Sequence, residues 1–213
     1  MMKLYTLPGA CSTANHIALR WSGLPFEPAV VTRDSAVSAE LRLLNPAGTV
    51  PLLVDGDFVL TQNAAIMGYA ADRAPQARLM GDGSGRQRAE TMRWLMFSNA
   101  DIQPVFGTFF APRLFIDDEA QFEALQSRAR RRLQASYERA DARLLEQAWL
   151  AGFRSVADAH FYIMLRWAAM FGVDLDGLAG IAAFTARMET DDGVLAALAA
   201  EGLPLLTTSA VAA

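Results

Sequence analysis

The chain has 213 residues, a formal net charge of −4, and 53% apolar against 20% charged residues. This composition excludes a disordered chain, and the acidic balance argues against nucleic acid as a main partner. The start, Met1–Leu4, lacks the apolar run of a signal peptide, and the most apolar stretch, 157–173, is too short and too charged to span a membrane. One cysteine and two histidines leave no internal disulfide and no zinc-ligand spacing. We therefore expect a soluble, cytoplasmic protein with no metal site and no membrane partner.

The N-terminal segment combines a short strand, a turn and a helix around the only cysteine. Lys3–Leu7 is apolar enough for a strand and ends at Pro8-Gly9, a turn signal. A helical period follows and continues until Gly23. Cys11 thus lies at a helix N-terminus, where unpaired backbone N–H groups and the helix dipole favour negative charge. The position predicts a thiol biased toward the thiolate, the form that attacks electrophiles.

The first eighty residues predict an α/β unit with the order βαβαββα. Pro28 removes a ladder donor from the second strand, so this strand should lie at a sheet edge. The Asp55-Gly56-Asp57 turn between two apolar runs predicts a hairpin, and Thr61 or Asn63 is expected to cap the last helix. The elements are a strand at 3–7, a helix ended by Gly23, a strand at 26–31, a helix at 38–44, strands at 50–54 and 58–60, and a helix to about 73.

A boundary follows this unit. Pro75 ends the helix, and residues 81–85 have the most flexible composition in the chain. Beyond them no stretch is typical of a strand, so we expect a domain at 1–78, a linker at 79–86 and an all-helical domain at 87–213. Pro104 should kink or end the first of these helices. The predicted helices are 88–97, about 119–144, 155–171, 180–189 and 192–200.

Two features of the helical part are specific enough to interpret. Ser155-Val156-Ala157-Asp158 is a capping-box arrangement and opens a helix that is apolar nearly all round, as a central core helix should be. A cluster of arginines on the long helix is interpreted as a solvated face paired with nearby acids. These arginines are Arg128, Arg130, Arg131 and Arg132.

Cys11 admits several kinds of chemistry. A dithiol site needs a second cysteine three residues on, where Ala14 stands, so no internal disulfide can cycle. His16 lies roughly 140° round the helix from Cys11, which rules out a Cys-His catalytic pair. A thiol reaction at Cys11 would then need a sulfur brought by a ligand, and the alternative is a small buried hydrophobe.

Two further sites could hold such a ligand. A cis Val50-Pro51 bond would expose the backbone of Val50 to pair with an extended peptide. Gln62-Asn63 offers side-chain amides beside free N–H groups at a helix start, which suits a carboxylate. For Asn63 the alternative is a plain N-cap.

Several motifs in fixed order carry a resemblance that covers nearly the whole chain. They are Leu7-Pro8-Gly9-Ala10-Cys11-Ser12 with His16-Ile17; Asn45-Pro46-Ala47-Gly48-Thr49-Val50-Pro51-Leu52-Leu53; Leu60-Thr61-Gln62-Asn63-Ala64-Ala65-Ile66 with Tyr69; Trp94-Leu95; and Ser155-Val156-Ala157-Asp158-Ala159. With them the chain resembles a cytosolic glutathione transferase, most closely the bacterial beta class. The resemblance implies a thioredoxin-like N-terminal domain, an all-helical C-terminal domain and a homodimer.

The resemblance also implies roles for individual residues. The Val50-Pro51 bond would be cis, Val50 would hold the cysteinyl part of glutathione, and Gln62 and Asn63 would meet its γ-glutamyl end. Catalysis would fall to Cys11, beside the glutathione sulfur, with Ser12 as its helper. The capping-box residues would serve the fold rather than the chemistry. The implied glutathione-binding residues are Cys11, Arg33 (for the glycyl carboxylate), Thr49, Val50, Pro51, Gln62, Asn63 and Gln103.

The chain departs from the family pattern at four positions. Asn63 replaces a usual Ser or Gly, Met96 a frequent asparagine, and Pro104 a common lysine. Gln103 stands where beta-class members usually place a histidine. A glutamine can hydrogen-bond but cannot take a proton near neutral pH, so that side of the site is changed.

Three functions follow from the resemblance. In the first, a detoxifying transferase conjugates glutathione, held as its thiolate, to a hydrophobic electrophile. The candidate wall of the electrophile site is Phe106, Phe109, Phe110, Phe115 and Trp167, for which ordinary core packing is the alternative. In the second, Cys11 forms a mixed disulfide with glutathione and acts as a thiol transferase or peroxidase. In the third, the chain is a non-catalytic ligand-binding protein with the same fold.

Overall fold

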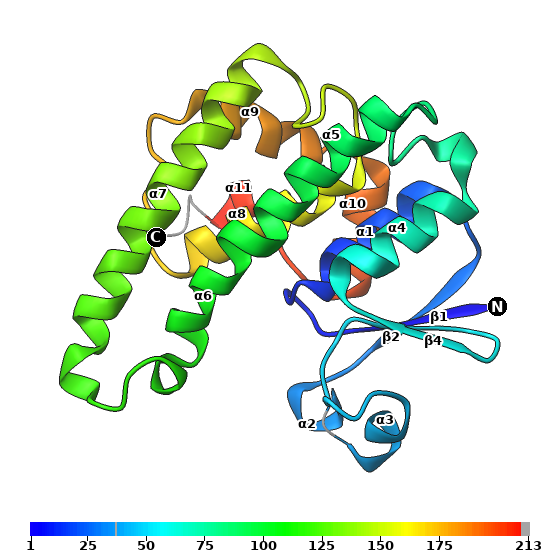
Figure 1. Ribbon diagram of the computed structural model, residues 1–213, viewed down its shortest axis with the longest axis horizontal. Coiled ribbons are helices and arrows are strands. Elements are labelled where there is room, and N and C mark those ends of the chain that lie inside the picture. Colours follow the sequence, from blue (N-terminus) through cyan, green and yellow to red (C-terminus); the bar gives the residue numbers. More distant parts are fainter. Residues whose placement is uncertain (37, 210–213) are drawn as a thin grey trace.

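A computed structural model describes residues 1–36 and 38–209 and has a sheet at one side and a larger set of helices at the other (Figure 1). The strands are β1 (Met2–Thr6), β2 (Phe26–Val30), β3 (Leu52–Asp55) and β4 (Phe58–Thr61), in the order β2-β1-β3-β4. β1 and β2 are parallel, and the other pairs are antiparallel. The edge position predicted from Pro28 is confirmed, and so is the hairpin, where Gly56 turns the chain with a φ of 65°.

The helices of this unit are α1 (Ser12–Ser22), α2 (Arg33–Ala36), α3 (Ala39–Leu44) and α4 (Asn63–Arg73). Gly23 ends α1 in the left-handed region with a φ of 70°, as the sequence predicts. The short helix α2 was not predicted. The predicted cap of α4 is wrong: Gln62, with a φ of 74°, occupies the N-cap position, and Asn63 is already the first helical residue.

The segment between α4 and the next long helix is held by specific contacts, although its glycines predict flexibility. Leu79 and Met80 are buried in the core. The Asp82 N–H group donates to Gln87 Oε1, 2.9 Å away. Gly81 has a φ of 102°, so glycine serves a tight turn there that an L side chain would strain.

No described residue after Thr61 is in a strand, which agrees with the predicted all-helical part; residues 210–213 of that part lie outside the described residues. The elements are η1 (Pro75–Ala77), α5 (Gly85–Met96), the π-helical η2 (Phe97–Ile102), α6 (Gln103–Phe110), η3 (Pro112–Leu114), η4 (Glu119–Gln121), α7 (Phe122–Glu146), α8 (Val156–Met170), α9 (Ala179–Met188), α10 (Asp192–Ala200) and α11 (Leu206–Ser209). Pro104 lies in the first turn of α6, directly after the π-helical segment. A proline is tolerated there because its missing N–H needs no helical partner. In the part of the chain that the structure describes, no helix combines the length and the apolar character that a membrane crossing requires.

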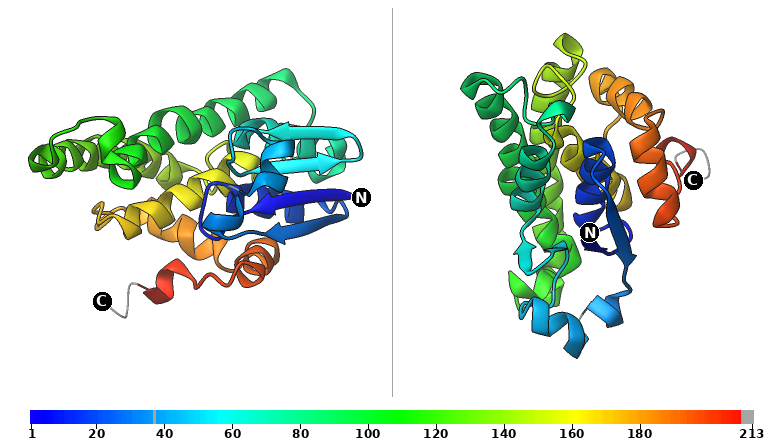
Figure 2. Two further views of the ribbon diagram at one scale, coloured as in Figure 1. Left: turned by 90° about the horizontal axis from the view of Figure 1, so that it is seen from below. Right: turned by 90° about the vertical axis from the view of Figure 1, so that its right-hand side faces the viewer.

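A single core joins the sheet unit to the helical part. α1 packs against α4 of its own unit and against α8 and α10 of the helical part. The right-hand view of Figure 2 shows α1 between the green helices and the orange C-terminal helices. A Cβ atom on Gly193 would lie 2.6 Å from Cδ1 of Trp21, so glycine is required where α10 meets α1. The Trp21 Nε1–H group also donates to Asp191 at the start of α10 (2.6 Å).

α8 is buried along nearly its whole length, as predicted, and its start is fixed by a fully buried carboxylate. Asp158 accepts hydrogen bonds from the backbone N–H and the hydroxyl of Ser155 (2.8 and 2.9 Å) and from the N–H of Leu150 (3.0 Å). The capping box is therefore confirmed, and it also anchors the loop that precedes α8.

We predict that Asp158→Ala lowers the free energy of unfolding by about 3 kcal/mol, because buried donors lose their acceptor. Urea denaturation followed by circular dichroism measures this loss. The matched control is Ser84→Ala, which removes an exposed cap from α5 and should cost about 1 kcal/mol. Equal losses in the two variants would contradict the assigned role of Asp158.

Candidate functional site

A cavity of about 420 Å³ opens at the N-terminus of α1. Its walls come from the β1–α1 turn, the loop before β3, the β4–α4 junction and the η2–α6 helix. The lining residues are Cys11, Asn45, Ala47, Thr49, Val50, Pro51, Thr61, Gln62, Asn63, Asn99 and Gln103. The structure thus brings together every predicted binding residue except Arg33. None of the lining side chains is charged.

Cys11 occupies the N-cap position of α1 and is partly buried. Its Sγ lies 4.0 Å from the carbonyl oxygen of Val50. Burial raises the pKa of Cys11 to about 11, although hydrogen bonds from Gln103 and from backbone N–H groups act in the opposite direction. The predicted thiolate bias is therefore wrong for the protein without a ligand: desolvation of the sulfur outweighs the helix N-terminus.

The opposite wall is the loop that ends in a cis Val50-Pro51 bond, as the resemblance implied. Asn45 holds this loop, because its Nδ2–H group donates to the carbonyl oxygen of Thr49 (2.7 Å) and its Oδ1 accepts from the N–H of Ala47 (3.2 Å). β3 begins at Leu52, two residues later than predicted. The backbone around Val50 is thereby left outside the ladder and beside Cys11.

Asn63 contributes a buried side-chain amide to the cavity lining. The residue is 4% exposed, yet neither its side-chain oxygen nor its side-chain nitrogen has a hydrogen-bond partner among the described residues. The alternative of a plain N-cap is wrong, because no side chain caps α4. Asn15 instead fixes this end of the helix by donating to the carbonyl oxygen of Asn63 (2.9 Å). Since buried amides are normally paired, a polar ligand in the cavity would complete this site.

The helical part contributes Gln103 and Asn99 to the cavity. Gln103 Oε1 lies 2.8 Å from Nε2 of His160 on α8. Asn99 was missed, although it stands four residues before Gln103, the spacing that places two side chains on one helix face. The other lining residues absent from the predicted site are Asn45, Ala47 and Thr61, all of which lie in motifs that carried the resemblance.

Ser12 and Arg33 lie outside the cavity lining. Ser12 is fully buried, its Oγ accepts from the N–H of Leu7 (3.0 Å), and it lies 3.0 Å from the hydroxyl of Thr6. This position gives no support to Ser12 as the helper of a thiolate. Its hydrogen bonds instead stabilise the turn between β1 and α1. Arg33 is exposed on α2.

A buried carboxylate from the C-terminal helices fixes the turn between β1 and α1 that carries Cys11. Glu201, at the end of α10, accepts hydrogen bonds from the hydroxyls of Thr6 (2.8 Å) and Thr13 (2.6 Å) and from His16 Nδ1 (2.9 Å). His16 therefore faces away from Cys11, which confirms the exclusion of a Cys-His pair. No sequence signal could have found Glu201, because its partners are 185 to 195 residues away in the chain.

Trp167 on α8 holds the other side of the same turn. Its Nε1–H group donates to the carbonyl oxygen of Gly9 (2.7 Å), two residues before Cys11. Gly9 itself has a φ of 73°, a conformation that favours glycine. Trp167, predicted as a wall residue, is itself buried, and its observed contact positions the loop that carries the thiol.

The remaining residues of the predicted aromatic wall separate into three groups. Phe106 and Phe109 belong to the core, so the prediction that they face a substrate is wrong. Phe110 is 44% exposed, with its ring centroid 4.9 Å from that of Trp167 and 4.8 Å from that of Phe171. Phe115 packs over Gly107 on a different face of α6.

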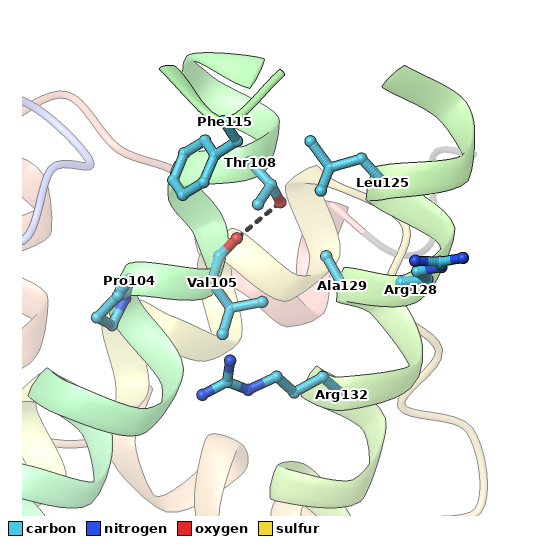
Figure 3. Close-up of a pocket in the computed structure, with 8 residues that line it drawn as sticks. All are labelled: Pro104, Val105, Thr108, Phe115, Leu125, Arg128, Ala129 and Arg132. Atoms are coloured by element: carbon cyan, nitrogen blue, oxygen red, sulfur yellow. Dashed lines mark hydrogen bonds between the residues drawn. The ribbon is translucent and has the colours of Figure 1, made fainter. Parts of the chain in front are cut away.

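Phe115 lines a second cavity, of about 340 Å³, between α6 and α7 (Figure 3). Arg132 reaches across this cavity toward α6, whereas Arg128 points away from it (Figure 3). Neither pairs with an acid in the described part of the chain, although Arg130 pairs with Glu123 (3.3 Å). The predicted pairing of the arginine cluster with acids therefore holds only in part.

No group of three or more His, Cys, Asp or Glu side chains among residues 1–36 and 38–209 is arranged to hold a metal ion.

We predict that Glu201→Gln lowers the free energy of unfolding by about 2 to 4 kcal/mol and also speeds alkylation of Cys11 by iodoacetamide, because the turn loosens. The matched control is Glu189→Gln. Glu189 is also a buried carboxylate, but its partners, Tyr162 and Thr207, belong to the helical part. The control should lose stability without a change in Cys11 alkylation. Identical alkylation rates in the two variants would show that Glu201 does not hold the turn.

Comparison with known families and proteins agrees with this geometry. Residues 9–73 match the family Glutathione S-transferase, N-terminal domain, and residues 97–192 match Glutathione S-transferase, C-terminal domain. The chain is 50% identical over 203 residues to Glutathione S-transferase GST-4.5 of Xanthomonas campestris pv. campestris, covering 95% of this chain and 100% of that protein.

Solved structures give the same result. A glutathione S-transferase from Xylella fastidiosa superposes with a TM-score of 0.92 at 48% identity, over 96% of this chain and 100% of that one. A sphingomonad glutathione S-transferase complexed with glutathione (TM-score 0.82) and a bacterial beta class enzyme of Sphingomonas chungbukensis (TM-score 0.83) are each 32% identical, over 95% of this chain and 100% of theirs. These matches confirm the resemblance to the bacterial beta class. The chain belongs to the glutathione S-transferase family.

Proposed function

We propose that this protein conjugates glutathione to a hydrophobic electrophile, and that it serves to detoxify such compounds. The observation that carries the proposal is the cavity at Cys11 with the unpartnered amide of Asn63 in its wall. The solved sphingomonad relative, which holds glutathione, supports the same ligand.

Glutathione would lie along the cavity as an extended peptide. Its γ-glutamyl end would meet Gln62, Asn63 and the N-terminus of α4, and its cysteinyl backbone would pair with Val50. Because none of the lining side chains is charged, the negative charge of that end would be held by neutral N–H donors and the dipole of α4. Asn63 then gains the partners that it lacks in the free protein.

The glutathione sulfur would lie beside Cys11 and Gln103. Since burial raises the pKa of Cys11 to about 11, its thiol keeps its proton at neutral pH and acts as a hydrogen-bond donor. A protonated neighbour stabilises a glutathione thiolate, whereas a second thiolate would repel it. In the reaction the thiolate attacks an electrophilic carbon, a C–S bond forms, and the leaving group departs with its electron pair.

The electrophile would contact the exposed ring of Phe110, which packs on the buried Trp167 and the half-buried Phe171. This aromatic group adjoins the cysteine turn because Trp167 bonds to Gly9. The raised pKa of Cys11 disfavours the redox alternative, which begins with a Cys11 thiolate. The third alternative, a ligand carrier, would bind glutathione and leave electrophiles unchanged.

We also propose that the protein is a cytoplasmic homodimer with domains at 1–78 and 87–213 joined by a linker at 79–86. Exposed apolar side chains on β4 and α5 support an interface with a second copy: Phe58, Val59 and Met92. The single cysteine suits a reducing compartment.

We predict that Asn63→Ala weakens glutathione binding about tenfold to a hundredfold, because the bound ligand loses a buried amide partner. Isothermal titration calorimetry measures the dissociation constant. The matched control is Thr91→Val. Thr91 is another buried side chain with an unpartnered oxygen, but it lies outside the cavity lining, so binding should not change. If the wild-type protein gives no heat with glutathione, both enzyme functions are excluded.

Conjugation to a chlorinated nitroaromatic distinguishes the reactions. We expect Cys11→Ala to retain glutathione binding and to lower kcat about tenfold, the effect of one hydrogen bond to a developing charge. Reduction of glutathione mixed disulfides should be negligible in the wild type. Loss of such an activity in Cys11→Ala, together with absent conjugation in the wild type, would favour the redox function instead.

A further inference from the structure

His160 is a buried histidine to which the proposed reaction gives no role. It lies on α8 and is fully buried, and its Nε2 is 2.8 Å from Oε1 of Gln103. Gln103 is in turn part of the cavity wall beside Cys11. One hydrogen bond therefore links the core of the helical part to the cavity that holds the sulfur.

The protonation of this ring follows from its surroundings. Burial lowers the pKa of His160 to about 3, so the imidazole is neutral and carries a single N–H. Its Nδ1 has no partner among the described residues. A proton on Nδ1 would leave a buried donor unpaired, which is rarer and costlier than an unpaired acceptor. We therefore assign the proton to Nε2, which donates to the Gln103 oxygen.

This assignment fixes which end of the Gln103 amide faces the cavity. The oxygen is occupied by His160, so the NH₂ group is the end that remains for Cys11. In agreement, the Gln103 side chain acts to lower the pKa of the Cys11 thiol, as a donor does. Without the imidazole the amide could turn over and present its oxygen to the sulfur. An oxygen there would destabilise a thiolate, whereas an N–H group stabilises one.

We propose that His160 is a positioning residue that holds the Gln103 amide so that its N–H group, and not its oxygen, faces the sulfur atoms in the Cys11 cavity. For the glutathione sulfur this rests on the proposed function, while for Cys11 it applies to the free protein. Since no charged side chain lines the cavity, such oriented dipoles set how readily a sulfur in it loses its proton. At position 103, where the resemblance implies a histidine, this chain has Gln103, and the histidine that contacts it is His160 on α8.

The test uses alkylation of Cys11 by iodoacetamide in the full chain, followed by mass spectrometry from neutral to alkaline pH. Cys11 is the only cysteine, so the rate reports one thiolate. We expect His160→Phe to slow alkylation about threefold or more at a given pH, as a higher Cys11 pKa requires. His160→Gln, whose amide N–H can replace Nε2–H, should restore the wild-type rate.

Two comparisons separate positioning from a general packing role. Tyr162 lies on α8, as His160 does, and donates a hydrogen bond of 2.8 Å to Glu189. Tyr162→Phe removes this bond from the helix and should leave the alkylation rate unchanged. Adding His160→Phe to Gln103→Leu should slow alkylation no further than Gln103→Leu alone, because His160 acts through Gln103. An unchanged rate in His160→Phe, or effects of the two substitutions that multiply, would overturn the proposal.

A further variant covers the case in which His160→Phe fails to fold. Gln103→Glu keeps the shape of the side chain and replaces the donor by an acceptor, so it must slow alkylation; a rate equal to wild type would overturn the proposal. With glutathione bound, the ultraviolet absorbance of its thiolate should titrate at higher pH in His160→Phe. Calorimetry on the wild type separates the proposed function from the role of His160. If glutathione does not bind, the proposed function is wrong, while the alkylation rates of Cys11 still test whether His160 positions Gln103.

Discussion

The structure depends on one buried carboxylate beneath the turn that carries the cysteine. Glu201 comes from the last long helix and receives three hydrogen bonds from the strand and helix on either side of that turn. Removing one partner would leave a buried polar group uncompensated, so the contact is costly to break. Trp167 adds a second tie through Gly9. The cavity is therefore a property of the sheet unit and the helical part together, and neither would hold its geometry alone.

In the same cavity, oriented dipoles rather than charged side chains are available to stabilise an anionic ligand. The cavity lining contains no ionised side chain, the thiol of Cys11 keeps its proton, and His160 is neutral. What remains to stabilise an anionic sulfur is a helix N-terminus, a thiol S–H group and an amide held in one orientation. Preorganised neutral donors of this kind stabilise charge where it develops without reorganising during the reaction. The exposed ring of Phe110 then supplies an apolar contact for the other substrate.

Local signals in the sequence were sufficient for most of the fold. The Pro8-Gly9 turn, the Asp55-Gly56-Asp57 hairpin and the capping box at Ser155 each depend on residues close together in the chain. Burial and long-range contacts were not predictable in this way. The thiolate expected at Cys11 was wrong because desolvation depends on what packs over the turn, and Glu201 could not be paired with it from the sequence. Phe115 shows the same limit, since it lies after the end of α6, directly following η3, where the helical period no longer gives its direction.

Protection of Cys11 from iodoacetamide by glutathione tests the central claim, that the cavity holds glutathione with its sulfur at Cys11, most directly. The single cysteine gives an unambiguous readout by mass spectrometry. Glutathione, or an analogue with a methyl group in place of the thiol, should slow alkylation in proportion to the occupied fraction of the cavity. An alkylation rate that does not change at saturating concentrations of either peptide would contradict the account.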